Sequence, residues 1–268
     1  MDSELDHRIA LALLEWQLEL GADEAIGEAP VNRFAAARLT PQQSPARPRQ
    51  AGVAGDAAAG AQSAATADPV AEARRAAAAA GSLEELDTAL RTFAHCPLKR
   101  GAKTTVFADG NPAARVMIIG EAPGRDEDIR GRPFVGRAGR LLDRMFAAIG
   151  LARDSADSAS ALYITNILPW RPPQNRDPTP EEIALLLPFV TRHVELAAPG
   201  MLVLMGNISC QALLGRRGIT RLRGNWAQAL GRPALPMFHP AYLLRNPAAK
   251  RAAWNDLLML QARLKEEK

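Results

Sequence analysis

Three polar segments of the sequence each follow a short apolar run and carry residue types that could act on a bound ligand. The first, Gly120–Gly139 (GEAPGRDEDIRGRPFVGRAG), holds glycines and prolines that allow a tight loop whose backbone amides approach a ligand. The second, WRPPQNRDP (Trp170–Pro178), follows a run that delivers Thr165 and Asn166. The side-chain amide of Asn166 offers a donor and an acceptor and therefore suits the edge of an amide-like ring. The third, HPAYLLRNP, begins with His239 where a strand is expected to meet a helix, because Pro240 suits a first helical turn.

Each of these segments also has a plainer interpretation. Asn166 can be a turn-forming residue, and a lone histidine such as His239 is more often structural than catalytic. The Gly-rich loop matches neither the GxxxxGK[ST] pattern that binds phosphate nor the GxGxxG pattern that binds dinucleotides. The sequence therefore predicts a ligand site at these segments and excludes both of those nucleotide-binding classes.

The elements that must position the three segments are buried strands. Four apolar runs are short and largely non-alternating: Arg115–Gly120, Leu162–Leu168, Met201–Gly206 and Leu235–Phe238. Helical patterns such as Leu141–Ile149 and Pro180–Leu196 separate them. This arrangement is typical of an α/β fold in which about four parallel strands are covered by crossover helices. Because ligands bind beyond the carboxyl ends of such strands, the polar segments are expected to meet at one edge of the sheet.

Composition bounds the class of protein. Of the 268 residues, 47% are apolar and 23% charged, which suits one large domain or a domain with an appendage. The sequence has no run of 18 apolar residues, and Asp2, Glu4 and Asp6 stand where a secretory signal carries bases. We therefore expect a cytoplasmic protein without a membrane span. Its two cysteines, Cys96 and Cys210, are too few for a disulfide scaffold or a four-thiolate metal site.

Charge is divided unevenly along the chain. Residues 1–95 contain 8 basic and 14 acidic residues, whereas residues 96–268 contain 25 basic and 15 acidic ones. A basic C-terminal part favours a polyanionic partner, because phosphates neutralised by arginine release condensed counterions. An arginine-rich surface without such a partner is the alternative that charge alone leaves open.

The chain divides into three parts by sequence texture. Within residues 1–27, apolar residues at helical spacing predict an amphipathic helix over 4–21. Residues 28–70 are rich in alanine, proline, glycine, glutamine and serine without apolar periodicity, which predicts a flexible linker. Residues 71–268 are expected to form the functional domain. The two N-terminal parts could recruit a partner or be a dispensable tail.

Taken together, the segments GEAPGRDEDIRGRPFVGRAG, YITNILPWRPPQNRDP and HPAYLLRNP resemble the family 4 uracil-DNA glycosylases in order and spacing. The resemblance extends over roughly Cys96 to Leu264 and leaves the acidic N-terminal part outside. It implies a three-layer α/β/α sandwich around a mainly parallel four-stranded sheet. It also implies a monofunctional DNA repair enzyme that flips uracil out of single- or double-stranded DNA, hydrolyses its N-glycosidic bond and leaves an abasic site. We further expect a monomer.

The resemblance assigns roles to four residues around the base. Phe134 resembles the platform on which uracil stacks, and Ala122 belongs to the uracil-binding segment. Asn166 matches the residue that reads N3–H and O4 of uracil, where cytosine presents the opposite donor and acceptor pattern. His239 matches the histidine that donates to O2 while negative charge accumulates on the leaving base.

Two carboxylates of the first segment match functional positions of the family. Departure of uracil leaves a cation-like sugar, so either Glu121 or Glu127 could position water or stabilise the positive charge. We assign Glu121 to the water, and Glu127 to shaping the pocket.

Further positions resemble the family's DNA contacts. Leu243 resembles the wedge that fills the hole left by the flipped nucleotide. The other expected DNA-binding residues are Asn175, Arg176, Arg245 and Pro240, the last through the backbone amides that follow it.

The sequence departs from the family at its iron–sulfur site. Family members usually hold a 4Fe-4S cluster with four cysteines, and only Cys96 remains here. The other three positions fall at Lys99, Trp170 and Leu186, none of which replaces a thiolate. We therefore expect neither this cluster nor another metal.

Two other functions stay open. The protein could be a related glycosylase for another deaminated base, or a non-catalytic DNA-binding or partner-binding module that kept the fold. The joint presence of Glu121, Phe134, Asn166 and His239 disfavours the module, because binding alone does not require all four.

Overall fold

The computed structural model describes residues 68–266 of the chain. The helix expected within residues 1–27 and nearly all of the linker expected at 28–70 lie outside these described residues. The first described helix, α3 (Pro69–Ala79), begins two residues before the expected start of the domain. Asp68 caps it by accepting a hydrogen bond from the Val70 amide at 3.0 Å, and Pro69 occupies the first turn, where no backbone donor is needed.

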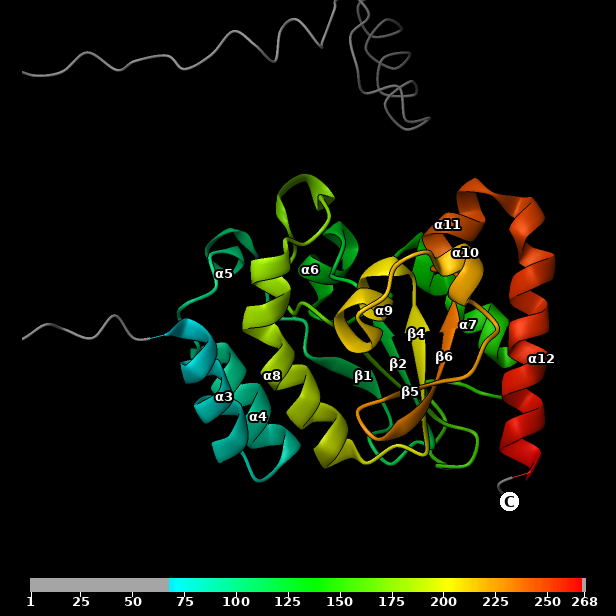
Figure 1. The fold of residues 1–268 in the computed structure, drawn as a ribbon, viewed down its shortest axis with the longest axis horizontal. Coiled ribbons are helices and arrows are strands. Elements are labelled where there is room, and N and C mark those ends of the chain that lie inside the picture. Colours follow the sequence, from blue (N-terminus) through cyan, green and yellow to red (C-terminus); the bar gives the residue numbers. More distant parts are fainter. Residues whose placement is uncertain (1–67, 267–268) are drawn as a thin grey trace, which may run out of the picture. The chain divides into compact units, whose positions relative to one another are not determined.

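Four parallel strands form the centre of a six-stranded sheet (Figure 1). In spatial order they are β3 (Leu162–Asn166), β2 (Val116–Gly120), β4 (Met201–Met205) and β6 (Arg232–Met237). Antiparallel strands β1 (Ala108–Gly110) and β5 (Ala227–Ala229) extend the two edges. The four expected strands are confirmed, and the edge strands are additions that apolar runs do not reveal because each has only three residues.

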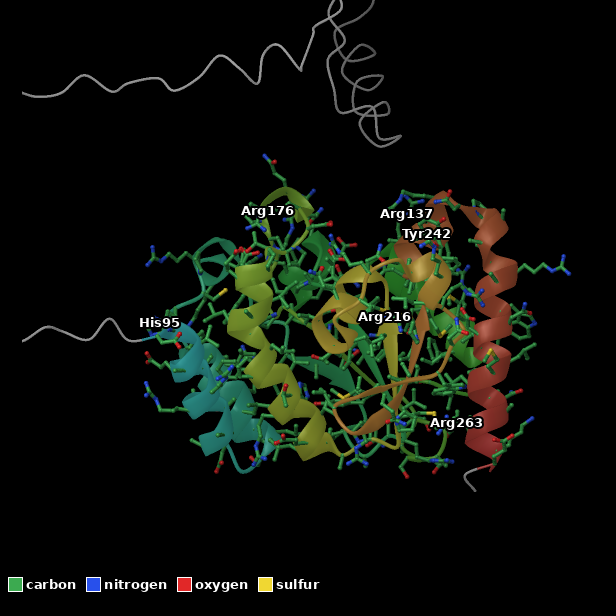
Figure 2. All side chains as sticks on the ribbon, in the orientation of Figure 1. His95, Arg137, Arg176, Arg216, Tyr242 and Arg263 are labelled. Atoms are coloured by element: carbon green, nitrogen blue, oxygen red, sulfur yellow. The ribbon has the colours of Figure 1, made fainter. Side chains whose placement is uncertain are left out.

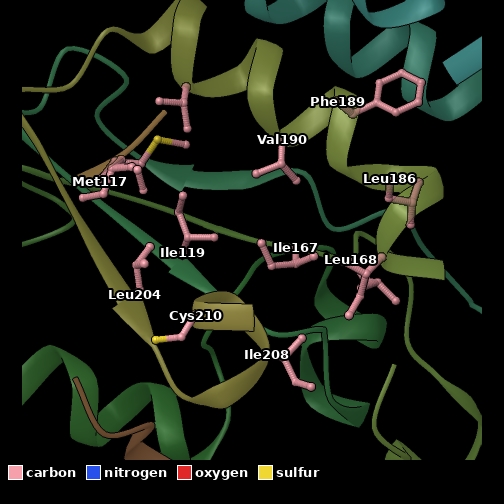
Figure 3. Close-up of a cluster of buried hydrophobic side chains, with 14 of the residues drawn as sticks. Met117, Ile119, Ile167, Leu168, Leu186, Phe189, Val190, Leu204, Ile208 and Cys210 are labelled. Atoms are coloured by element: carbon pink, nitrogen blue, oxygen red, sulfur yellow. The ribbon is translucent and has the colours of Figure 1, made fainter. Parts of the chain in front are cut away.

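Helices cover both faces of the sheet. On one face lie α8 (Pro180–Ala197) and α9 (Asn207–Leu214), with α3 and α4 (Leu83–Thr92) packed against α8. On the other face lie α7 (Arg137–Ala147) and α12 (Lys250–Glu266). Successive residues of β2 alternate between the two cores: Met117 and Ile119 enter the first, Val116 and Ile118 the second. Figure 3 shows the first core, and the expected three-layer sandwich is confirmed.

Shorter helices fill the connections. They are α5 (Leu98–Gly101), α6 (Arg125–Arg130), η1 (Pro173–Asn175), α10 (Ile219–Leu222), α11 (Pro240–Arg245) and η2 (Pro247–Ala249). In the part of the chain that the structure describes, no helix has the length and apolarity needed to cross a membrane.

Strand register brings the three polar segments together. Gly120 at the end of β2 pairs with Asn166 at the end of β3, so the segments that follow them begin side by side. β6 ends at Met237, two residues before His239, and its carboxyl end faces the same edge of the sheet. β3, the next strand along the chain, lies on one side of β2, and β4, the strand after it, lies on the other side. The direction in which strands are added to the sheet therefore reverses at β2. Such a reversal opens a crevice for a ligand.

Candidate active site

A cavity of about 310 Å³ lies at this edge of the sheet. It brings together all the residues to which the sequence assigned base recognition or catalysis: Glu121, Ala122, Glu127, Phe134, Asn166 and His239. Three expected DNA-binding residues, Asn175, Arg176 and Arg245, also line it. Figure 2 shows Arg176 on the loop before α8 and Tyr242 on α11, both at the end of the domain toward which the central strands point.

The aromatic wall of the cavity is Phe134. Its side chain is packed against the end of β2, where a Cβ atom on Gly120 would lie only 2.6 Å from the ring and 2.3 Å from Asn166 Oδ1. Glycine is therefore required at position 120 to let ring and amide approach the strand. The ring centroid of Phe134 is 5.4 Å from that of His239, which places a stacking surface beside the imidazole.

Asn166 presents an amide without a protein partner. It is 6% exposed and lines the cavity, and its side chain makes no hydrogen bond to any residue between 68 and 266. Burying a polar group without a partner is unfavourable, so such an amide is suited to a ligand that supplies the missing donor and acceptor. Its backbone at the end of a buried strand places the amide at the cavity.

His239 is a neutral donor in this setting. Its Nδ1 accepts a hydrogen bond from the Ala241 amide at 3.2 Å, at the start of α11. The proton of the neutral ring must then be on Nε2. Burial lowers the pKa of His239 to about 4, and the nearby charge of Arg245 adds to this effect. The imidazole therefore remains uncharged at neutral pH and can donate from Nε2.

The two carboxylates have different surroundings. Glu127 accepts hydrogen bonds from the amides of Val135 and Gly136, both at 2.9 Å, and of Gly124 at 3.1 Å. It therefore holds the loop that carries Phe134. Glu121 has no such partner among the described residues, and burial raises its pKa to about 7. A poorly solvated, unpartnered carboxylate is the better candidate to act on water.

Two residues that the sequence did not assign to the site influence Glu121. Asp177 and Arg217 lie 3.7 Å apart and line a second cavity of about 550 Å³ that shares Glu121 and His239 with the first. The charge of Asp177 adds to the rise of the Glu121 pKa, while Arg217 opposes it. Asp177 lies within the WRPPQNRDP segment, but Arg217 follows α9 in a loop whose sequence carries no signal.

The expected DNA contacts are only partly free to act. Arg176 pairs with Glu182 through two hydrogen bonds of 2.9 and 2.6 Å, and Asn175 accepts one from Arg171 at 2.7 Å. These side chains therefore hold the loop before α8. Arg245 makes no ion pair within the described part of the chain. Pro240 is buried in the first turn of α11.

Leu243 does not occupy the surface position expected of a wedge. It is 1% exposed and belongs to the core, whereas the neighbouring Leu244 is 37% exposed. Leu244 follows Ala241 by three residues, so its side chain neighbours this cavity-lining residue on the surface of α11. Leu243 would have to leave the core to enter a duplex.

The family's iron–sulfur positions do not fit a cluster. Cys96, Trp170 and Leu186 are all buried in the first core, and burial raises the pKa of the Cys96 thiol. The Lys99 ammonium donates to the carbonyls of Arg91 and Phe93 at the end of α4 and lies 5.9 Å from the Trp170 ring centroid. One thiol cannot ligate four irons. No group of three His, Cys, Asp or Glu side chains between residues 68 and 266 is placed to hold a metal ion.

Sequence comparisons agree with this geometry. Residues 107–258 match the uracil DNA glycosylase superfamily. Type-4 uracil-DNA glycosylases of Archaeoglobus fulgidus and Thermotoga maritima are 35% and 37% identical, over 65% and 64% of this chain and 89% of each relative. A type-5 uracil-DNA glycosylase of Pyrobaculum aerophilum is 30% identical over 51% of this chain and 66% of its own. The matched residues make up more than half of the chain and include every side chain that lines the cavity. The chain therefore belongs to the uracil DNA glycosylase superfamily.

Proposed function

We propose that the protein is a uracil-DNA glycosylase that removes uracil from DNA by hydrolysis and leaves an abasic site for repair. The observation that carries this function is the convergence, in one cavity, of an unpartnered amide, a neutral imidazole donor, an aromatic ring and a carboxylate of raised pKa. Each group meets one requirement of breaking the bond between uracil and deoxyribose.

Recognition of the base uses Phe134 and Asn166. A base inside a duplex is unreachable, so it is rotated out at a cost of a few kcal/mol. Stacking on Phe134 returns about 1–3 kcal/mol of this cost. The amide of Asn166 accepts from N3–H and donates to O4 of uracil, and cytosine, which has the reverse pattern, leaves the amide unpaired.

Bond cleavage uses the charge separation of the transition state. His239 donates from Nε2 to O2 as uracil becomes anionic, and this donor is worth about 2.7–4 kcal/mol of stabilisation. Glu121, as the carboxylate, holds the attacking water and stabilises the cationic sugar. Glu127 acts indirectly, by holding the loop that carries Phe134 and thereby shaping the pocket.

DNA is held by Arg245 and opened by a leucine of α11. Arg245 lines the cavity, and its charge suits a phosphate next to the flipped nucleotide. We assign the wedge to Leu244 rather than to the buried Leu243, because only Leu244 is exposed at the surface of the helix. Asn175 and Arg176 also line the cavity.

We also propose that the enzyme works without an iron–sulfur cluster. Support comes from the donor set, since Lys99, Trp170 and Leu186 pack together with Cys96 in place of three further thiolates. Iron and sulfide analysis of anaerobically purified protein should find neither in stoichiometric amount. About four of each per chain would contradict the proposal.

The assembly and organisation of the protein are further proposals. We propose a monomer that acts in the cytoplasm on single- or double-stranded DNA, and one chain supplies every residue that lines the cavity. The proposed catalytic unit is residues 71–268; the helix expected within 1–27 and the linker expected at 28–70 precede it in the sequence.

The decisive experiment is incubation with oligonucleotides that contain one uracil, single- or double-stranded, followed by alkaline cleavage. Release of free uracil with an intact abasic strand supports the proposal, and a borohydride-trapped protein–DNA adduct contradicts the monofunctional mechanism. The same assay with oligonucleotides that contain hypoxanthine or xanthine tests the alternative that the protein is a glycosylase for another deaminated base. Tight DNA binding without any base release would indicate the non-catalytic module.

A further inference from the structure

The platform residue Phe134 has an unusual backbone conformation. Its φ angle is +52°, in the left-handed region that bulky side chains rarely adopt. The first residues of α7 approach it closely, because a Cβ atom on Gly139 would lie 1.8 Å from the Phe134 carbonyl oxygen. Surrounding groups must therefore hold this turn in place, since the chain does not favour it by itself.

Two oppositely charged side chains hold the turn from its two sides. The Glu127 carboxylate accepts hydrogen bonds from the amides of Val135 and Gly136. The Arg153 guanidinium donates to the carbonyls of Pro133 at 2.9 Å and Phe134 at 3.0 Å. The donors and acceptors of the turn are thus satisfied by one anion and one cation.

Arg153 is itself held rigidly. Nη1 donates to Asp109 Oδ2 at 2.8 Å, and Nε donates to Asp143 Oδ1 at 2.8 Å. Its side chain is 11% exposed, and all three nitrogens are occupied by two carboxylates and two carbonyls. Asp109 belongs to β1 and Asp143 to α7. The guanidinium therefore connects the turn at residues 133–136, here called the platform turn, to the edge of the sheet and to the neighbouring helix.

We propose that Arg153 is a positioning residue that sets the orientation of the Phe134 ring and thereby the rate of uracil release. The inference rests on the proposed function, because it concerns the ring on which the base stacks. Arg153 does not line the cavity and acts only through the turn. A lysine cannot take its place, because one ammonium does not reproduce the planar fork that reaches two carboxylates and two carbonyls.

Arg132 offers a matched control. It also pairs with Asp109, through Nε at 3.0 Å and Nη2 at 2.9 Å, but its side chain is 58% exposed and has no hydrogen bond to the platform turn. Arg132→Met therefore removes an arginine from the same carboxylate without releasing Phe134.

The test compares Arg153→Met, Arg153→Lys and Arg132→Met in the full chain, each alone and combined with Phe134→Ala. The single-turnover rate of uracil release should fall about tenfold or more in both Arg153 variants, and no further than in Phe134→Ala. Affinity for an oligonucleotide with an abasic analogue should change by less than about twofold, because that ligand has no base to stack and is held through phosphates. Arg132→Met should react at the wild-type rate.

The double variants separate positioning from general destabilisation. In the Phe134→Ala background, either Arg153 substitution should cause little further loss, since the ring through which Arg153 acts is gone. A folded Arg153→Met protein with the wild-type rate would overturn the inference, as would losses that multiply in the double variant. If Arg153→Met does not fold, Arg153→Lys, which keeps a cation between Asp109 and Asp143, decides by the same criteria. Absence of uracil release by the wild-type protein would instead refute the proposed function.

Discussion

Replacement of Glu121 by glutamine should remove the pH dependence of uracil release. Burial raises the pKa of Glu121 to about 7, with Asp177 adding to the rise and Arg217 opposing it. In the proposed mechanism the ionised form holds the attacking water, so kcat/KM should rise with pH up to about 7 and level off above it. Between pH 7 and pH 5 the ionised fraction falls about 50-fold, and kcat/KM should fall with it. His239, with a pKa of about 4, adds no second limb in this range.

The same carboxylate should also affect stability. Its folded-state pKa of about 7 is above the ordinary value of 4.5, so its contribution is fully present below pH 4.5 and is lost as pH rises through 7. A difference of about 2.5 pKa units corresponds to at most about 3 kcal/mol, and solvent in the cavity reduces this figure. Glu121→Gln should therefore be more stable than the wild type at pH 8, with the gain vanishing near pH 4.5.

The assay uses a single-stranded uracil oligonucleotide, which avoids the cost of opening a duplex. At pH 8, Glu121→Gln should lose about 10²–10⁴-fold in kcat/KM and show a flat profile between pH 5 and 8. Asp126→Asn, an exposed acid of the same loop, is the matched control and should keep the wild-type profile. Urea unfolding at pH 4.5 and 8 measures the stability effect. If kcat/KM of Glu121→Gln still falls between pH 7 and pH 5 as it does in the wild type, the assignment of this carboxylate is refuted.

Four further substitutions test the remaining roles. Asn166→Asp should lose uracil turnover because a carboxylate cannot donate to O4, and unchanged turnover by the folded variant would contradict the amide's role. His239→Ala should reduce the single-turnover rate by about 10²–10³-fold with little change in affinity for an uncleavable uracil analogue, whereas a parallel fall of both would indicate a structural role. Leu244→Ala should slow uracil excision from duplex DNA more than from single strands and leave the stability of the protein unchanged. Leu243→Ala should instead lower the free energy of unfolding by about 2–5 kcal/mol. The reverse pattern would assign the wedge to Leu243.

Local sequence was sufficient for the central strands of the sheet and for many of the residues that line the cavity. The four apolar runs predicted the four parallel strands, because a strand buried on both faces is apolar at most positions. Asn166 ends such a strand and His239 closely follows another, so the strand ends determine where these two residues lie. Phe134 lies beyond α6 in the segment that follows β2, and its place in the cavity depends on how that segment folds back. The edge strands β1 and β5 were missed, because three residues carry too little pattern.

Tertiary packing gave neighbouring, chemically similar residues different surroundings. The side chains of Leu243 and Leu244 leave α11 in different directions, and because of the way this helix packs only Leu244 reaches the surface. Glu121 and Glu127 are both acids of the segment that follows β2, yet only Glu127 accepts hydrogen bonds from the amides of Val135 and Gly136. The sequence determines residue types and spacing along the chain, whereas solvation and distant partners arise only when separate segments fold together. For this reason the raised pKa of Glu121, the neutral Nε2–H form of His239 and the grip of Arg153 on Phe134 came from the structure alone.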